Sequence, residues 1–329
     1  MSTPTLDGCG REISYLRVSV TDRCNLRCVY CMPAEGVPDL GHNRMLRLEE
    51  IARLVRIGAG LGIRNVRITG GEPLVRLGIV DLVAMIRAIE DIESISMTTN
   101  GIALPQFAEQ LAGAGLNRVN ISLDTLDADR YRTITRRGRL EDALAGIRAA
   151  YAFGLTPVKI NMVVMAGVND DEVVSFAGRT VSEGWHVRFI EFMPLGEQAR
   201  LARASYVSST VTRQRIEEAW GPLVPADIEG FGPARTWRVP GSDGSIGLIS
   251  ALSQHFCSSC NRIRLTADGT LVPCLFSDLA YDLWEPMRAG ADDDSLRDIW
   301  LEALAHKPAG HHLERALTTT SHQMSRIGG

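Results

Sequence analysis

Residues 13–31, ISYLRVSVTDRCNLRCVYC, join a β-rich run directly to three closely spaced cysteines, and this stretch decides the fold. More β-rich runs follow, alternating up to about residue 195 with amphipathic stretches such as 48–62 and 140–154, each of which ends at a glycine. This alternation predicts parallel strands joined by helices. The expected strands are ISYLRVSV (13–20), NVRIT (65–69), SISMTT (94–99), RVNISLD (118–124), PVKINMVV (157–164) and HVRFIEF (186–192).

Six strands in this rhythm predict an α/β fold, an incomplete (βα)6 barrel of the TIM type, over residues 1–195. The rhythm stops near Gly196, and a Gly/Pro-rich run follows at 230–245. We therefore expect residues 196–329 to form a C-terminal cover of short strands and loops. Polar and glycine-rich segments follow the strands, so the carboxyl ends of the strands are the expected place for an active site.

The composition describes an ordinary globular chain of 329 residues with 45% hydrophobic residues and a formal net charge of −4. It offers no overall basic field for nucleic acid or an anionic membrane, so any anion site must be built locally. The first thirteen residues lack an apolar segment, and no later stretch resembles a membrane span. We expect a soluble, cytoplasmic enzyme.

Six of the seven cysteines form two triplets that are more than 200 residues apart, which is typical of two metal sites rather than of disulfides. Three thiolates on a cubane iron–sulfur cluster leave one iron open for a further ligand. Zinc is the alternative in each case and would need a fourth ligand, such as His42 for the first triplet or His255 for the second. The predicted ligands are Cys24, Cys28 and Cys31, and Cys257, Cys260 and Cys274.

The first triplet, spaced C-x3-C-x2-C after a strand, resembles the motif of the radical S-adenosylmethionine (SAM) superfamily. Tyr30 and the sequence TGGEP (69–73) strengthen the resemblance, because the glycines allow backbone to approach a ligand closely. It implies a [4Fe–4S] cluster whose open iron binds SAM. Family members contact SAM at the positions of Tyr30, Gly71, Ser122 and Met193.

The second triplet encloses NRIRLTADG (261–269), in which Arg262 and Arg264 alternate on a probable strand and ADG forms a hairpin turn. Two arginines beside metal thiolates suggest an anion clamp. This pattern, with the terminal pair Gly328-Gly329, resembles one branch of the superfamily, the GTP 3′,8-cyclases of molybdenum cofactor (molybdopterin) biosynthesis. The resemblance implies a second [4Fe–4S] cluster and GTP as substrate.

Further cations lie at strand positions that barrels normally fill with apolar side chains, and they require an anionic partner such as a triphosphate. The positions implied for GTP are Arg17, Arg67, Thr98, Lys159, Arg262, Ile263 and Arg264, and those implied for catalysis are Arg17, Arg262, Arg264, Gly328 and Gly329. The family reaction begins with reductive cleavage of SAM. The resulting radical removes the hydrogen from C3′ of GTP, and that carbon then adds to C8 of the guanine.

The resemblance also implies partners, namely an electron donor and the next enzyme of the molybdopterin pathway, for a monomer or homodimer. Two alternatives stay open on the sequence alone. One is another radical SAM enzyme with an auxiliary cluster, such as a peptide-modifying maturase. The other is a zinc-stabilised binding protein, which would be colourless and would not need SAM.

Overall fold

Six parallel strands, β1 to β6, lie side by side in chain order and form the centre of a curved sheet. The structure is a computed structural model that describes residues 5–37, 40–228, 230–311 and 324–328, without the side chains of His42 and Glu197. The six parallel strands are β1 (Tyr15–Ser19), β2 (Asn65–Thr69), β3 (Ser94–Thr99), β4 (Arg118–Ser122), β5 (Lys159–Val164) and β6 (His186–Glu191). The predicted incomplete α/β barrel is confirmed.

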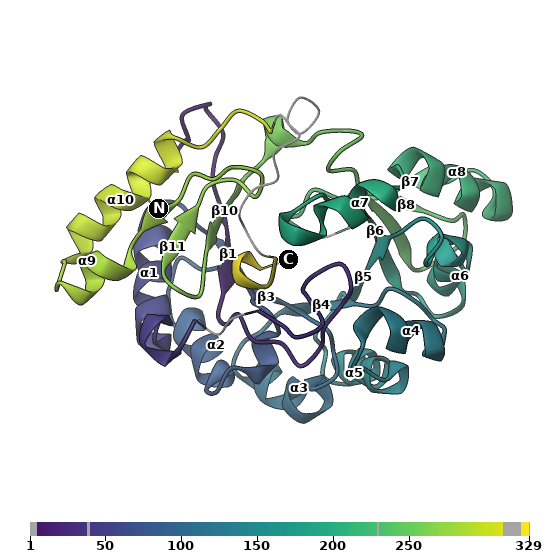
Figure 1. Ribbon diagram of the computed structural model, residues 1–329, viewed down its shortest axis with the longest axis horizontal. Coiled ribbons are helices and arrows are strands. Elements are labelled where there is room, and N and C mark those ends of the chain that lie inside the picture. Colours follow the sequence, from purple (N-terminus) through teal and green to yellow (C-terminus); the bar gives the residue numbers. More distant parts are fainter. Residues whose placement is uncertain (1–4, 38–39, 229, 312–323, 329) are drawn as a thin grey trace.

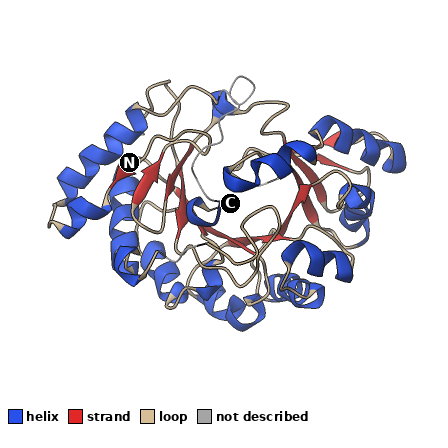
Figure 2. Ribbon diagram, viewed as in Figure 1, coloured by secondary structure: helices blue, strands red, loops and turns tan. Residues whose placement is uncertain are grey.

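Helices cover the outer, convex side of the sheet, as Figures 1 and 2 show. They include α1 (Leu48–Gly60), α2 (Ile79–Arg87), α3 (Leu104–Gly113), α4 (Ala128–Thr135), α5 (Leu140–Ala152), α6 (Val173–Ser182), α8 (Ser209–Trp220), α9 (Trp284–Arg288) and α10 (Asp293–Ala305). The short helices α7 (Ala199–Ala204) and α11 (Met324–Ile327) lie on the inner side instead. Helices α1 and α5 each end within two residues of the predicted glycine stop.

Alternation along each strand separates an apolar outer face from a polar inner face. In β2, Val66 and Ile68 pack in the main hydrophobic core, whereas Arg67 between them lines an interior pocket. The register carries this pattern across the sheet, because Arg67 lies beside Arg17 of β1 and Ser96 of β3. The inward positions of these neighbouring strands therefore carry polar side chains, where barrels usually have apolar layers.

The C-terminal half of the chain lengthens the same sheet at both edges, in the order β12-β11-β10-β1 on one side and β6-β9-β8-β7 on the other. Strand β10 runs parallel to β1, and β9 runs parallel to β6. These strands are β7 (Val224–Pro225), β8 (Arg235–Arg238), β9 (Ser245–Ile249), β10 (Arg262–Leu265), β11 (Thr270–Val272) and β12 (Tyr281–Asp282). The cover is thus partly continuous with the barrel, and its division from the barrel at residue 195 stays a prediction.

The short helix α11 lies in the middle of the curved sheet (Figure 1). Gly328, which follows it, is buried and has a φ of 73°. A Cβ atom at Gly328 would stand 1.7 Å from Thr69 Oγ1 at the end of β2. Only glycine therefore fits here, and the chain reaches the carboxyl ends of the barrel strands at its C-terminal end.

Candidate active site

The first cysteine triplet lies in a loop that is fastened to the end of α4. Within the loop, the backbone N–H of Arg27 donates to Thr135 O at 3.0 Å, and that of Val29 donates to Ile134 O at 2.9 Å. The Arg136 guanidinium then donates to the carbonyl of Met32 at 3.0 Å. These bonds hold the three thiols on one side of the loop, where they line a pocket.

The glycine-rich loop after β2 packs directly against the segment that precedes Cys24. The N–H of Gly71 donates to Thr21 O at 2.7 Å, and that of Glu72 donates to Arg23 O at 2.8 Å. A Cβ atom at Gly71 would stand 2.3 Å from Arg23 O. Glycine is therefore required for this approach, which brings the loop to the wall of the cysteine pocket.

Glu72 is a buried carboxylate that ties this loop to the end of β3. It accepts hydrogen bonds from the Thr99 hydroxyl at 2.6 Å and from the N–H groups of Asn100 and Leu74 at 2.7 and 3.1 Å. Burial raises the pKa of Glu72 to about 7, because these three bonds only partly offset the loss of hydration. Glu72 also lines the cysteine pocket and could receive a cationic group there.

A second buried carboxylate orients the tyrosine of the cysteine motif. Asp124, just after β4, accepts a hydrogen bond from the Tyr30 hydroxyl at 2.7 Å and another from the N–H of Val163 at 2.9 Å. Burial raises the pKa of Asp124 to about 6. All four residues predicted for SAM line this one pocket together with the triplet, namely Tyr30, Gly71, Ser122 and Met193. We call it the SAM pocket.

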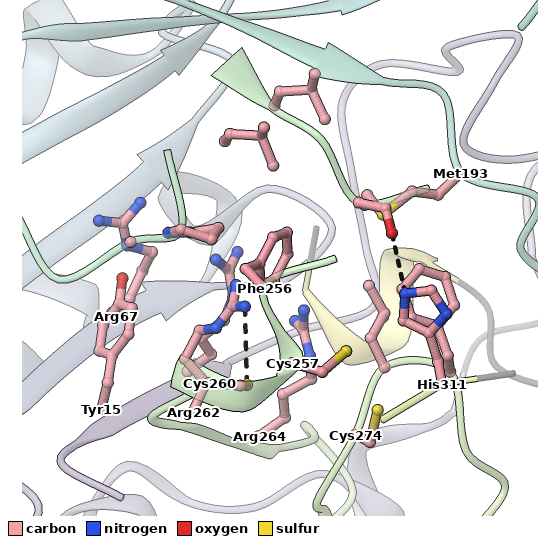
Figure 3. Close-up of a pocket in the computed structure, with 18 of the residues that line it drawn as sticks. Tyr15, Arg67, Met193, Phe256, Cys257, Cys260, Arg262, Arg264, Cys274 and His311 are labelled. Atoms are coloured by element: carbon pink, nitrogen blue, oxygen red, sulfur yellow. Dashed lines mark hydrogen bonds between the residues drawn. The ribbon is translucent and has the colours of Figure 1, made fainter. Parts of the chain in front are cut away.

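A second interior pocket collects the cations of the barrel and the second triplet (Figure 3). Its described lining contains no carboxylate. The cations are Arg17, Arg67, Arg188, Arg262, Arg264 and Lys307, and the thiols are those of Cys257, Cys260 and Cys274. We call it the cationic pocket.

Arg67, Arg188 and Arg264 of the cationic pocket are buried, and neighbouring arginines lie close enough to repel one another. Burial, with neighbouring arginines, lowers the pKa of Arg188 to about 9 and that of Arg264 to about 10. The Asn120 amide oxygen accepts hydrogen bonds from Arg67 and from Arg188, the latter at 3.1 Å. Burial of a cation is costly unless an anion lies nearby, so a pocket with this many cations and no carboxylate in its described lining suits a multiply charged anion.

The two cysteine triplets have different electrostatic surroundings. Burial raises the pKa of the Cys24 thiol to about 11 and that of Cys31 to about 12, and Asp124 contributes to the second shift. At the second triplet burial acts in the same direction, but Arg262 and Lys307 outweigh it and lower the pKa of Cys260 to about 7. The surroundings of Cys260 are therefore more positive than those of the first triplet, whereas burial still raises the pKa of Cys274.

The arrangement of the thiols bears on which metal group they suit. Within the described ranges, no three His, Cys, Asp or Glu side chains are grouped so that they could hold a single metal ion. His255 lines a different, apolar pocket with Phe192 and Leu252, and the side chain of His42 lies outside the described residues. Three thiols around one pocket suit a cubane cluster, because each thiolate binds a separate iron.

The SAM pocket and the cationic pocket share part of their walls. Thr98, Ile190, Met193 and Met324 line both of them. The hydroxyl of Thr98 is buried and has no hydrogen-bond partner among the described residues. Ligands in the two pockets would therefore meet at these four side chains.

The tail of the chain closes this junction. The guanidinium of Arg264 donates to the carbonyl of Gly328 at 2.6 Å and to that of Ile327 at 3.3 Å. The structure thus brings together Arg264 and Gly328, two of the positions implied for catalysis. Gly329 lies outside the described residues.

Two residues predicted for GTP do not line the cationic pocket. Ile263 points its side chain into the hydrophobic core, because it alternates with Arg262 and Arg264 on β10. Lys159, at the start of β5, is buried. Its Nζ lies next to Gly230, where an added Cβ atom would stand 2.7 Å from it. The structure thus gives neither side chain a direct position in this pocket.

Sequence reasoning missed several residues that do line the cationic pocket. Arg188 and Asn161 lie next to each other in the register of β5 and β6, at inward positions. Alternation offers a signal for Asn161, because it lies on the same face of β5 as Lys159, and Arg188 is its neighbour on β6. Tyr15, Asn120 and Lys307 also line the pocket, and the last of these had no sequence signal.

Comparison with known families divides the chain into two matched regions. Residues 18–179 match the radical SAM superfamily, and residues 185–313 match the family described as Molybdenum Cofactor Synthesis C. The GTP 3′,8-cyclase of Moorella thermoacetica is 53% identical over 97% of this chain and 98% of its own length. The GTP 3′,8-cyclase of Petrotoga mobilis is 49% identical over 98% of this chain and 100% of its own length.

Some solved structures share the fold of this chain at low sequence identity. SuiB of Streptococcus suis, bound to S-adenosylmethionine, has a TM-score of 0.64 and 14% identity, and the match covers 88% of this chain and 65% of SuiB. The AdoMet-bound protein anSMEcpe has a TM-score of 0.60 and 15% identity, with 90% and 81% of the two chains covered. These likenesses concern the fold, whereas the full-length sequence matches define the family. The chain belongs to the GTP 3′,8-cyclase family of radical SAM enzymes.

Proposed function

We propose that the chain converts GTP to 3′,8-cyclo-7,8-dihydroguanosine 5′-triphosphate in a SAM-dependent radical reaction, the first step of molybdenum cofactor biosynthesis. The observation that carries this proposal is the junction of two different pockets. One combines a thiol triplet with a glycine-rich loop, and the other combines a second triplet with five arginines and Lys307. Their shared wall would bring a SAM-derived group next to a nucleotide.

In the SAM pocket, Cys24, Cys28 and Cys31 would hold the first [4Fe–4S] cluster. When bound, the cluster and SAM together supply a carbon radical that can remove hydrogen from a sugar carbon. The chain's own contribution is orientation. Glu72 and the backbone around Gly71 would receive the polar end of SAM, and Tyr30, Ser122 and Met193 would line the rest.

In the cationic pocket, Arg17, Arg67, Arg188 and the Arg262/Arg264 pair would bind the triphosphate through charge-assisted hydrogen bonds. Lys159 would not contact the triphosphate and would act indirectly, by adding positive charge behind Arg188. Thr98 would donate its unpaired hydroxyl to the nucleotide at the shared wall. Ile263 would act only through the strand backbone.

The second triplet, Cys257, Cys260 and Cys274, would hold a second [4Fe–4S] cluster, whose three-thiol donor set leaves one position open to the substrate. Arg264 would keep Gly328, and with it Gly329, beside the nucleotide. A closed interior then keeps water away from the reacting carbon. Each of these groups would help to hold the reacting atoms in place, and such positioning can lower the activation free energy of a reaction substantially.

The proposal has a direct test. Protein that is purified and reconstituted without oxygen should hold about eight irons and eight sulfides per chain, as two cubanes require. With SAM and a strong reductant it should form 5′-deoxyadenosine when GTP is present, and a cyclised nucleotide should appear in equal amount. ATP is the matched control, because it carries the same triphosphate on a different base. SAM cleavage that is indifferent to GTP would favour another radical SAM reaction, and zinc without sulfide would exclude radical chemistry.

We also propose that the enzyme works in the cytoplasm as a monomer or homodimer, that it receives electrons from a separate donor, and that its product passes to the next enzyme of the pathway. In the described part of the chain, no helix has both the length and the apolar character needed to cross a membrane. We keep residues 1–195 and 196–329 as proposed functional units, each contributing one cluster site.

A further inference from the structure

Lys307 is a buried cation that the proposed reaction leaves without a role. It follows helix α10 and lines the cationic pocket, yet only 4% of it is exposed. Its Nζ donates a hydrogen bond of 2.6 Å to the carbonyl of Pro273. Pro273 immediately precedes Cys274, so Lys307 directly contacts the backbone of the second thiol triplet.

The charge of Lys307 requires a partner that Pro273 does not supply. An ammonium group has three donors, and among the described residues Lys307 makes this one side-chain hydrogen bond. Burying an uncompensated ammonium costs several kcal/mol. Burial lowers the pKa of Lys307, and the thiolate charges of Cys260 and Cys274 act against that shift, whereas Arg11 and Arg262 add to it. The thiols line the same pocket as Lys307, so they are the groups placed to supply its counter-charge.

The backbone around Lys307 is fixed to the same triplet from the other side. Arg11 donates hydrogen bonds to Cys257 O at 2.7 Å, to Pro308 O at 2.8 Å and to Ala309 O at 3.1 Å. Its guanidinium also forms an ion pair of 2.6 Å with the fully buried side chain of Asp7. One guanidinium thus sets the distance between the lysine segment and Cys257.

We propose that Lys307 is a positioning residue of the second cluster site and that its ammonium is the buried counter-charge that sets the reduction potential of that cluster. The inference rests on the second cluster of the proposed function. Three thiolates bring three negative charges, and reduction adds another, so a fixed cation within the low-dielectric interior favours the reduced form. The first triplet has Asp124 and Glu72 as its neighbours instead.

The test isolates the second cluster in the full-length chain by changing Cys24, Cys28 and Cys31 to alanine. In this background, Lys307→Met removes the charge and keeps an unbranched side chain, and Lys307→Arg keeps the charge. Arg297→Met, on the exposed side of α10, is the control. The readouts are iron and sulfide content and the midpoint potential from a redox titration followed by electron paramagnetic resonance.

We expect about four irons per chain in each protein, a more negative midpoint potential for Lys307→Met, and potentials near that of the parent for Lys307→Arg and Arg297→Met. An unchanged potential in Lys307→Met, or an equal shift in Lys307→Arg, would overturn the proposal. If Lys307→Met fails to assemble the cluster, the iron content of Lys307→Arg tests the proposal instead. Iron retained in Lys307→Arg would support a role for the positive charge, and iron lost from it would refute that role. A parent without four irons would refute the second cluster itself, whereas a failure to convert GTP in the native protein leaves this result unaffected.

Discussion

Arg264 and Gly328 are joined by a hydrogen bond of 2.6 Å, from the arginine Nη1 to the glycine carbonyl, in the interior of the barrel. Arg264 lies on β10 and faces the cationic pocket, while Gly328 lies against Thr69 at the wall of the SAM pocket. This contact couples the end of the chain to both pockets. It explains why the two features, which lie 64 residues apart, belong to one site.

Gly328→Ala should therefore displace the tail. The added Cβ would meet Thr69 Oγ1 at 1.7 Å, and the φ of 73° is unfavourable for alanine. We expect GTP conversion to fall by roughly 100-fold, about 3 kcal/mol in the barrier, with iron content unchanged. The matched control is Gly241→Ala, where φ is 81° and no atom lies within 4 Å of the added Cβ. Equal activity of the two variants would show that the tail contact is dispensable.

Thr98 and its neighbour Thr99 offer a paired test of the shared wall. Thr98→Val removes a buried hydroxyl without a described partner, so stability should be unchanged or rise slightly, while GTP binding should weaken by about tenfold. Thr99→Val removes the donor to Glu72 and the acceptor of the Gly101 N–H, so the free energy of unfolding should fall by about 1–3 kcal/mol. Equilibrium denaturation and nucleotide titration distinguish the two. Loss of stability in Thr98→Val would contradict the assignment.

Glu72 predicts a pH dependence of stability in the cofactor-free protein. Its pKa is raised from 4.5 to about 7 in the folded state, so the folded protein binds more protons than the unfolded chain between these values. Its contribution to stability is therefore present below pH 4.5 and is lost as pH rises through 7. We expect Glu72→Gln to reduce this slope, with a constant offset from the lost hydrogen bonds. Denaturation at pH 5 and pH 8 measures how the free energy of unfolding changes with pH in the parent and in Glu72→Gln. An equal change in both proteins would argue against a neutral Glu72.

The cysteines predict a graded loss of iron. Cys28→Ala and Cys260→Ala should each lower the iron content of reconstituted protein from about eight to about four per chain, because each triplet holds one cubane. Cys9→Ala is the control, since Cys9 is exposed and lines neither pocket. Elemental analysis with sulfide determination gives the result. A loss of all iron from either single variant would mean that the two sites do not assemble independently.

The sequence predicts the barrel and the SAM pocket well because both depend on local patterns. Strands β2 and β3 have the predicted bounds, and the loop at Gly71 follows β2 as expected. The glycines and the cysteine spacing encode close approaches within a few residues of each strand end. Alternation on β10 likewise predicts correctly that Arg262 and Arg264 face one side.

Long-range features of the site were not predictable in this way. No local pattern indicates that β10 pairs with β1 or β9 with β6, because such pairing depends on the whole chain. The position of Lys307 was not predictable for the same reason, because the segment that carries it is held by Arg11, almost 300 residues away. Ile263 was grouped with its two arginine neighbours because the motif was considered as a unit, and alternation puts its side chain in the core.

The pairing of β10 with β1 and of β9 with β6 also bears on biosynthesis of the protein. A nascent chain that has emerged only to residue 200 exposes β1 and β6 as unpaired edges, and such edges template association with other chains. Protection comes only when residues 245–265 leave the ribosome. The interval between these two moments is the period in which the half-made enzyme depends most on chaperones, and slow translation of this region would lengthen it.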